Sequence, residues 1–308
     1  MDSKQAEIIS LPSLPSDPIT RWWSSETVGI VTGGNKGIGY AMVKRLAEMG
    51  VTVVLTARDE DKGRKAIEKL KTELTHINTN NIHFLCLDVS DPSSIASFVS
   101  SFNQHFGLLH ILVNNAAVSF NDIGENSVEH AETVIKTNFY GAKLLTEALF
   151  PLFCLSSPNT FRLLNISSRL GSTNKLKNPT IRKILEKDDV TEEEVDGMVR
   201  LFLEDVKRGQ WRSRGWPDLW TDYAVSKLAM NAYTKILAKR YEGKGLSANC
   251  FCPGYTQTSM TRGKGTHTAD DVARVGTKLA LLPPPDLPTG KFFIIGAHNT
   301  SVIIHARL

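Results

Sequence analysis

The sequence has 308 residues, of which 41% are hydrophobic and 22% are charged, a composition typical of one large globular domain. Its 36 basic and 32 acidic residues leave a net charge of +4 without a long basic block, which argues against a nucleic-acid partner. No apolar run reaches the roughly 18 residues of a membrane helix, and no signal or transit pattern opens the sequence, so we expect no membrane partner and a cytoplasmic location.

The first 25 residues contain three prolines among serine and aspartate. Proline fixes φ and removes a backbone donor, so residues 1–25 are predicted to be a flexible extension without regular structure. Trp22 and Trp23, at its end, are expected to dock on the body of the protein. Residues 26–308 are predicted to form a single domain.

Seven short aliphatic or β-branched segments predict strands. They are Val28–Thr32, Val51–Thr56, His83–Leu87, Ile111–Asn114, Leu163–Ile166, Ser247–Cys252 and Phe292–Ile295. Because they are apolar almost throughout instead of alternating, they fit a parallel sheet whose two faces are both covered.

Longer segments between these strands place apolar residues three and four positions apart, which predicts helices. They are Ile38–Met49, Asp59–Leu74, Ser94–Phe106, Val128–Leu152, Tyr223–Tyr241 and Asp270–Leu281. Strands that alternate with helices in this way predict an α/β fold, a doubly wound (Rossmann-type) parallel sheet of seven strands with helices on both faces.

The first strand continues directly into a glycine-rich turn, Thr32–Gly39, with the letters TGGNKGIG. A strand, such a turn and a helix N-terminus together aim backbone N–H groups and a helix dipole at a pyrophosphate. Gly33 would permit the tight turn, Gly37 the close approach of phosphate, and Gly39 the packing of helix on strand. The turn therefore predicts a dinucleotide site.

The residue at the end of the second strand indicates whether the chain binds NADP or NAD. Arg58 lies there, where a basic side chain pairs with the 2′-phosphate of NADP and an acidic one accepts from the ribose of NAD. A guanidinium can bind phosphate through two parallel hydrogen bonds, so NADPH is predicted. Asp59, the next residue, leaves a preference for NAD open.

Tyr223 and Lys227 lie four positions apart in a predicted helix and so share one face. An ordinary tyrosine, with a pKa near ~10, exchanges its proton poorly at neutral pH. A neighbouring ammonium favours the phenolate, and we therefore expect a lowered pKa for Tyr223.

The motifs resemble, in their order, those of the short-chain dehydrogenases/reductases. The matching segments lie within residues 27–296 and are Thr32–Gly39, Leu87–Val89, Asn114–Ala117, Asn138, Ser168, Tyr223–Lys227 and Pro253–Gly254. Within this family the chain is similar to the plant monomeric carbonyl reductases of the salutaridine reductase and menthone reductase (neomenthol dehydrogenase) group. Ala117 departs from the family's usual glycine and narrows the space on the adenosine side of the cofactor.

The resemblance implies an NADPH-dependent reductase that interconverts a ketone or aldehyde and the alcohol of a small, lipophilic substrate. It makes Tyr223 the general acid, places Ser168 on the substrate oxygen in preference to Ser167, assigns Lys227 to the ribose, and gives Asn138 a water relay. The implied cofactor contacts are Gly33, Asn35, Lys36, Gly37, Ile38, Gly39, Arg58, Asp88, Val89, Asn115, Tyr223, Lys227, Pro253, Gly254 and Thr258.

Several alternatives remain at this point. Lys36 and Arg58 are either phosphate clamps or solvated surface charges, and Asp88 either contacts adenine or caps the following helix. The protein is either the reductase, a non-catalytic NADP-binding or redox-sensing protein, or an epimerase or dehydratase on the same sheet. The four cysteines lie in apolar stretches, and Cys250 and Cys252 offer only two of the ligands that a zinc site needs, so buried, reduced thiols and no metal are expected.

An insertion of about residues 173–221 precedes the Tyr223 helix. Asn178-Pro179 begins a short helix, and a capping box at Thr191–Glu194 leads into an apolar stripe that ends near Gly209. The stripe consists of Val195, Met198, Val199, Phe202, Leu203 and Val206. We expect it to fold onto the Tyr223 helix, keep the protein monomeric and roof the substrate pocket. Trp211, Trp216 and Trp220 are either pocket walls or simple packing.

Overall fold

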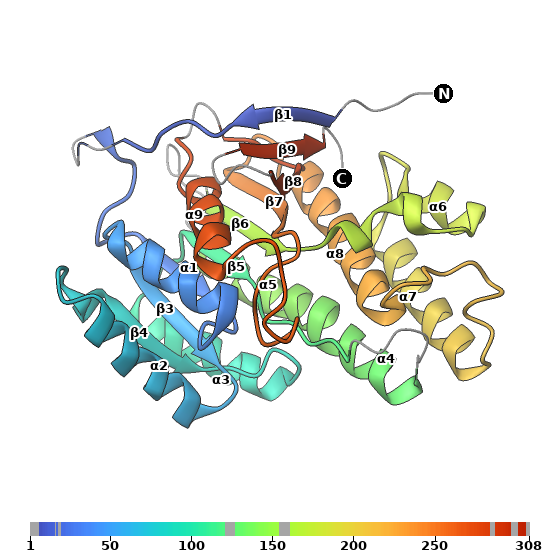
Figure 1. The fold of residues 1–308 in the computed structure, drawn as a ribbon, viewed down its shortest axis with the longest axis horizontal. Helices are drawn as coiled ribbons and strands as arrows, with labels where there is room; N and C mark the ends of the chain where they lie inside the picture. Colours follow the sequence, from blue (N-terminus) through green and yellow to red (C-terminus); the bar gives the residue numbers. More distant parts are fainter. Residues whose placement is uncertain are drawn as a thin grey trace.

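A nine-stranded sheet forms the centre of the computed structural model, which describes residues 6–15, 17, 20–120, 127–153, 161–283, 287–296 and 301–305 (Figure 1). The strand order is β1-β9-β8-β7-β6-β5-β2-β3-β4. Strands β2 to β8 are parallel: β2 (Val28–Val31), β3 (Thr52–Ala57), β4 (Ile82–Cys86), β5 (Ile111–Asn114), β6 (Phe161–Ile166), β7 (Leu246–Cys252) and β8 (Phe292–Ile295). The seven predicted strands are therefore confirmed.

Two antiparallel strands extend the sheet beyond β8. Strand β9 (Ser301–His305) pairs with β8, and β1 (Ala6–Ser10) pairs with β9, so that Ala6 faces His305. The expectation that residues 1–25 lack regular structure is wrong for this segment. Its Ile-Ile pair precedes the first proline, and its partner strand lies almost the whole sequence away, so local composition did not reveal the pairing.

The end of the N-terminal segment is anchored on the body, as expected. The indole of Trp22 donates to the carbonyl of Leu281, and that of Trp23 donates to the carbonyl of Met49, both over 3.0 Å. The guanidinium of buried Arg162 also stacks on the ring of Trp22, 3.3 Å from its centroid. These contacts anchor residues 22 and 23 on the body of the protein.

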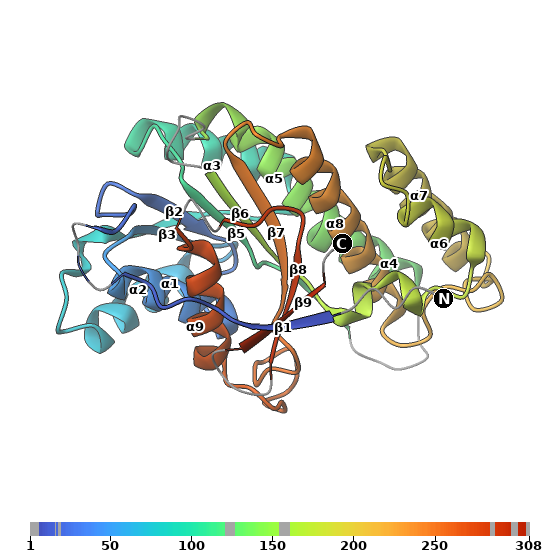
Figure 2. The ribbon, with the colours of Figure 1, turned by 90° about the horizontal axis from the view of Figure 1, so that it is seen from above.

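Helices cover both faces of the sheet, which confirms the doubly wound fold (Figure 2). One face carries α1 (Gly37–Glu48), α2 (Glu60–Glu73) and α9 (Ala269–Ala280), and the other carries α3 (Pro92–His105), α4 (Val128–Ile135), α5 (Ala142–Leu149) and α8 (Thr221–Arg240). Short 3-10 turns are η2 (Thr79–Asn81), η4 (Phe150–Leu152), η5 (Arg169–Gly171) and η6 (Thr173–Lys175). Each helical layer buries its own apolar core against the sheet.

The predicted helix Val128–Leu152 is interrupted by a π-helical segment, η3 (Lys136–Gly141), between α4 and α5. A Cβ at Gly141 would lie 2.6 Å from the carbonyl oxygen of Val89, so only glycine allows this close approach. Short π segments in helices often mark functional positions, and this one contains Asn138.

The insertion forms α6 (Pro179–Leu185) and α7 (Glu192–Lys207), on the side of α8 away from the sheet centre (Figure 1). The predicted capping box is present: the Thr191 hydroxyl accepts from the N–H of Glu194, whose carboxylate accepts from the N–H of Thr191. The predicted stripe is buried, apart from the partly exposed Leu203, and α7 packs against α8 and α4. The insertion therefore folds onto the Tyr223 helix as expected.

Candidate active site

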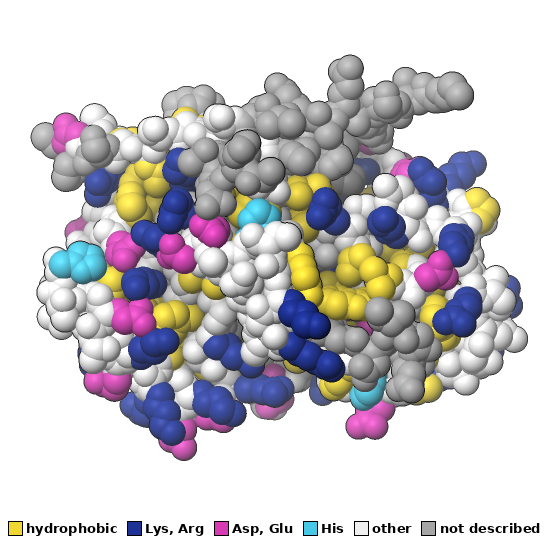
Figure 3. Space-filling view, in the orientation of Figure 1, with side chains coloured by type: hydrophobic (Ala, Val, Ile, Leu, Met, Phe, Trp, Pro, Cys, Tyr) yellow, Lys and Arg dark blue, Asp and Glu magenta, His cyan; other side chains and the backbone are white. Residues whose placement is uncertain are grey.

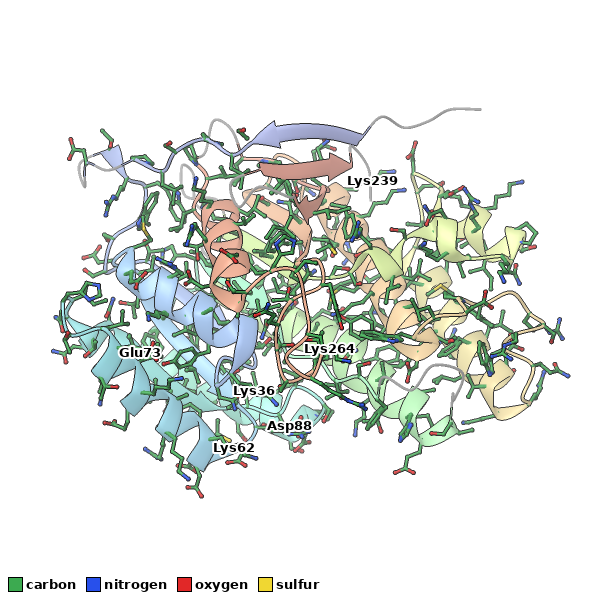
Figure 4. All side chains as sticks on the ribbon, viewed as in Figure 1. Lys36, Lys62, Glu73, Asp88, Lys239 and Lys264 are labelled. Carbon is green, nitrogen blue, oxygen red and sulfur yellow. The ribbon has the colours of Figure 1, made fainter. Side chains whose placement is uncertain are left out.

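A cavity of about 660 Å³ opens at the carboxyl ends of the parallel strands. It lies where the chain order of the strands reverses, between β2 and β5, which is the usual ligand position in doubly wound folds. Lys36, Lys62 and Asp88 lie near one another at this edge, and Lys264 lies above them on the loop after β7 (Figure 4).

Most of the predicted site residues meet in this one cavity. Those that line it are Gly33, Asn35, Lys36, Gly37, Ile38, Arg58, Asp88, Val89, Asn115, Ser168, Tyr223, Lys227, Pro253, Gly254 and Thr258. Gly39 and Asn138 lie behind its wall. Lining residues that the sequence did not single out include Lys62, Val118, Leu170, Leu219, Tyr255 and Met260.

The glycine turn has the backbone that its sequence predicts. Gly33 has a φ of 62°, which favours glycine. A Cβ on Gly39 would lie 2.4 Å from the carbonyl oxygen of Gly33, so this glycine lets the start of α1 rest on the turn. No side chain caps α1 and its first turn has no acidic residue, so its N–H groups and dipole are available to an anion.

The turn is tied to the neighbouring strand end. The hydroxyl of Thr32 accepts from the backbone N–H groups of Asn115 and Ala116, each over 2.9 Å, and the Asn115 amide donates to the Thr32 carbonyl. Ala117, which departs from the family pattern, also lines the cavity. The loops after β2 and β5 therefore form one rigid wall.

One end of the cavity is basic. Asp59 caps α2 and pairs with Lys62, whose Nζ lies 2.9 Å from a carboxylate oxygen, and the hydrogen bond from the Lys62 backbone lowers the pKa of Asp59. Neither Lys36 nor Arg58 forms an ion pair with any residue the structure describes. Lys36 and Arg58 are therefore available to bind a phosphate, whereas the carboxylate of Asp59 is occupied by Lys62. The sequence did not predict Lys62 as a site residue, because an exposed lysine in a charged helix resembles an ordinary surface residue.

Asp88 does not cap the helix that follows it. Its carboxylate accepts from the backbone N–H and the hydroxyl of Ser90, over 2.9 and 2.7 Å. Asp91 caps α3 instead, by accepting from the N–H of Ser93. The capping alternative for Asp88 is therefore wrong, and its side chain lines the cavity.

Tyr223 and Lys227 lie on one face of α8, with the lysine Nζ 5.4 Å from the centre of the tyrosine ring. The Lys227 ammonium donates to the carbonyl of Ile166 over 2.8 Å, and burial lowers its pKa to about 8. Burial, followed by the nearby Cys252 thiol, raises the pKa of Tyr223. The expected lowering is therefore not found, because loss of solvent opposes the phenolate more than the lysine favours it.

The two serines after β6 have different surroundings. Ser167 is buried and donates its hydroxyl to the amide oxygen of Asn231 over 2.5 Å. The hydroxyl oxygen of Ser168 accepts from the N–H of Leu170, which leaves its proton free to point into the cavity. This difference favours Ser168 as the serine that meets a substrate oxygen.

Asn138 is completely buried, and its amide is already engaged. Its oxygen accepts from the N–H of Val118 over 2.8 Å, and its nitrogen donates to the carbonyl of Val118 and the hydroxyl of Ser226. Both amide hydrogens are thus used. Asn138 joins the segment after β5 to α8, next to Lys227, without itself reaching the cavity.

The far end of the cavity is largely apolar, and one of the insertion's three tryptophans reaches it. Trp220 lines the cavity together with Leu219, whereas Trp211 and Trp216 are buried in the core. The indole of Trp216 donates to the carboxylate of Asp205 over 2.9 Å. In the described structure the insertion therefore roofs the pocket only through its last residues, and simple packing is correct for the other two tryptophans.

The cysteines only partly follow expectation. Cys250 and Cys252 are buried, Cys86 is exposed at the end of β4, and Cys154 lies outside the described residues. The expected burial is therefore wrong for Cys86, whose strand lies at the free edge of the sheet. Across the described ranges, no helix is long and apolar enough to cross a membrane.

Several known proteins are similar to this chain over most of its length. The profile of the family described as short chain dehydrogenase matches residues 27–179 and 215–269, so the unmatched interval falls in the insertion. The (+)-neomenthol dehydrogenase of Capsicum annuum is 39% identical, over 88% of this chain and 96% of that protein. Carbonyl reductase (NADPH) 1 of Rattus norvegicus is 36% identical, over 87% and 96%.

A solved structure gives the same relationship. Salutaridine reductase from Papaver somniferum superposes with a TM-score of 0.79 at 37% identity, covering 86% of this chain and 99% of that one.

Proposed function

The chain belongs to the short-chain dehydrogenase/reductase family, and from this premise we propose how the residues of its cavity carry out the reaction. The protein is an NADPH-dependent oxidoreductase that interconverts a ketone or aldehyde and the corresponding alcohol. The observation that carries the proposed roles is the opening of Tyr223, Lys227 and Ser168 into the same cavity as the glycine turn.

The cofactor fits the residues at the basic end. The uncapped N-terminus of α1 receives the pyrophosphate, and Lys36 and Arg58 hold the 2′-phosphate. Asp59 is paired with Lys62, which disfavours a role on the ribose of NAD. Asp88 and Val89 also line the cavity and would hold the adenosine, and Pro253, Gly254 and Thr258 would hold the nicotinamide.

NADPH, when bound, supplies a hydride to the carbonyl carbon. The hydroxyl of Tyr223 gives its proton to the oxygen, and burial, which keeps that hydroxyl protonated, suits the reductive direction. Ser168 donates a hydrogen bond that steadies the same oxygen, and Lys227 holds the ribose. Asn138 would support a proton relay only indirectly, by tying Val118 at the cavity to Ser226 on α8.

The substrate is small and lipophilic. The end of the cavity next to Tyr223 is lined by Val118, Leu170, Leu219 and Met260, which offer few polar partners. Two of the relatives are, by name, a dehydrogenase of (+)-neomenthol and a reductase of salutaridine. For this chain we propose a small, lipophilic carbonyl compound or alcohol as the substrate, and neither of those two compounds in particular.

The finer proposals concern the state of the protein. Because α7 covers the outer face of α8 within the same chain, we propose a monomer. An exposed, unpaired thiol at Cys86 suits a reducing compartment, and a cytoplasmic location is proposed.

Oxidation of NADPH with a panel of aldehydes and ketones tests the function, with Tyr223→Phe as the matched control. Wild type should consume NADPH and yield the alcohol, whereas the variant should lose about 100-fold or more in kcat, because the proton donor is gone. Its affinity for NADPH, measured by calorimetry, should stay within about twofold, since Lys227 holds the ribose.

Other outcomes separate the alternatives. Binding of NADPH without turnover of any carbonyl would favour a binding or redox-sensing protein. Conversion of substrate without net NADPH consumption would favour an epimerase or dehydratase. Substantial activity in Tyr223→Phe would overturn the catalytic assignment.

A further inference from the structure

Trp220, the residue just before α8, has an unusual backbone. Its φ of 50° and ψ of 52° lie in the left-handed region, which among the described non-glycine residues it shares only with Arg262. Bulky side chains rarely adopt this conformation. Such strain persists where the surroundings impose it, and it concentrates at ligand sites.

The structure holds Trp220 from both sides. Its carbonyl accepts from the N–H of Ala224 over 2.7 Å, in the first turn of α8. The hydroxyl of Thr221 donates to the carbonyl of Pro217, also over 2.7 Å, and the preceding Trp216 is anchored on Asp205 of α7. The insertion and the catalytic helix therefore set the direction of the Trp220 side chain together.

That direction is into the cavity, against the catalytic residue. The indole packs edge-on against the ring of Tyr223, with their centroids 5.8 Å apart, and it lines the cavity. Leu219 beside it is 45% exposed, and Tyr255, which also lines the cavity, is 46% exposed. Figure 3 shows hydrophobic side chains gathered on this face beside the loop after β7. Exposed apolar groups around a cavity mouth are typical of a binding surface.

We propose that Trp220 is a specificity-determining residue, which selects carbonyl substrates whose reacting carbon lies in an apolar ring or is bonded to one. The inference rests on the proposed function. A carbonyl oxygen that reaches the hydroxyl of Tyr223 places its neighbouring substituent against the indole. A ring covers that surface and excludes water from it, whereas a short alkyl chain leaves it exposed.

The test compares kcat/KM for a substituted cyclohexanone with kcat/KM for butanal, in wild type and Trp220→Gly. Glycine adopts a positive φ without strain, so the variant should keep its thermal stability. We expect at least a tenfold loss for the cyclic ketone and less than a threefold change for butanal, as for other apolar-pocket contacts of roughly this size. Trp220→Phe should restore most of the preference, and NADPH affinity should not change.

Arg262→Gly is the matched control, because it relieves the same backbone conformation at a position that does not line the cavity. Its substrate ratio should equal that of wild type. An unchanged ratio in Trp220→Gly, or the same shift in Arg262→Gly, would overturn the role of Trp220. Wild type that reduces neither substrate would instead overturn the proposed function, and this inference with it.

Discussion

At the scale of single residues, burial shifts the pKa values of Tyr223 and Lys227 in opposite directions, with the same effect on their charge. It raises the pKa of the phenol and lowers that of the ammonium, so it favours the neutral form of both. The sequence correctly predicted that the two side chains meet, because a four-residue spacing on a helix has that consequence. The balance between desolvation and charge depends on the neighbouring loops, which the spacing does not describe.

Lys227 gives the reaction a pH dependence. Its pKa falls from 10.5 to about 8, so the ammonium is present below about pH 8 and is lost above it. We expect kcat/KM for NADPH, which reports groups of the free enzyme, to fall as the pH rises through about 8. Between pH 8 and 10.5 the unfolded chain binds a proton that the folded chain does not, so this group makes stability rise there.

If activity falls while stability rises as the pH is raised, the loss of activity is due to deprotonation of Lys227 and not to unfolding. Lys227→Arg, which stays charged, should show a level profile at a lower rate. A wild-type profile that stays level up to the ordinary lysine range, about pH 10, would contradict the prediction.

Arg58 gives a prediction about cofactor choice. In Arg58→Asp an attraction to the 2′-phosphate becomes a repulsion, so the Kd for NADPH should rise about 100-fold or more. The Kd for NADH, which lacks that phosphate, should change less than about threefold. Isothermal titration with both nucleotides measures the effect, and Lys62→Met serves as a control for general loss of charge near the site. Equal losses for the two nucleotides would exclude a phosphate contact by Arg58.

At the scale of elements, the sequence predicted most helices and strands because their apolar spacing is regular. It did not predict the π segment at Lys136–Gly141. The segment exists because Asn138 bonds Val118 and because Gly141 lies against Val89. Both contacts are tertiary, and local sequence carries little signal for them.

One shielded cation helps to attach the insertion to the body of the protein. Lys143 of α5 pairs with Glu192 over 3.0 Å and with Asp196 over 3.1 Å, both on α7, and only 11% of its side chain is exposed. Lys143→Met keeps the aliphatic stem but leaves two carboxylates without their partner. The partners are partly solvated, so we expect a loss of about 2 kcal/mol, less than a fully buried pair would cost.

Urea unfolding measures this loss. Lys207→Met is the matched control, because its ion pair with Glu132 also joins α7 to the body but is half exposed. It should change stability by less than about 0.5 kcal/mol. Similar effects of the two substitutions would show that Lys143 has no special part in holding the insertion.

At the scale of the whole molecule, the sequence predicted the seven-stranded parallel sheet and helices on both of its faces, but not the order of the strands. The chain closes its sheet with two further strands that local patterns did not reveal. The sequence likewise left open whether Trp220 lines the substrate pocket or only packs in the core. Its position depends on how α7, the Trp216 anchor and α8 meet in space.

The association state follows from the same arrangement. Because the insertion covers the outer face of α8, light scattering at several concentrations should report about the chain mass, 34.0 kDa. Deletion of about residues 173–221 should expose the apolar surfaces of α4 and α8 and produce association or insolubility. A dimer or tetramer of the intact chain at every concentration would contradict this prediction.

The pairing of β1 with β9 has a consequence for the order of folding. Ala6 and His305 are neighbours in the sheet, yet nearly the entire chain is synthesised between them. During translation the parallel strands and their helices can assemble in turn, while β1 must wait for the last strand to emerge. Closing so long a loop is entropically slow, so we expect β1 to pair with β9 last, after the rest of the sheet has folded.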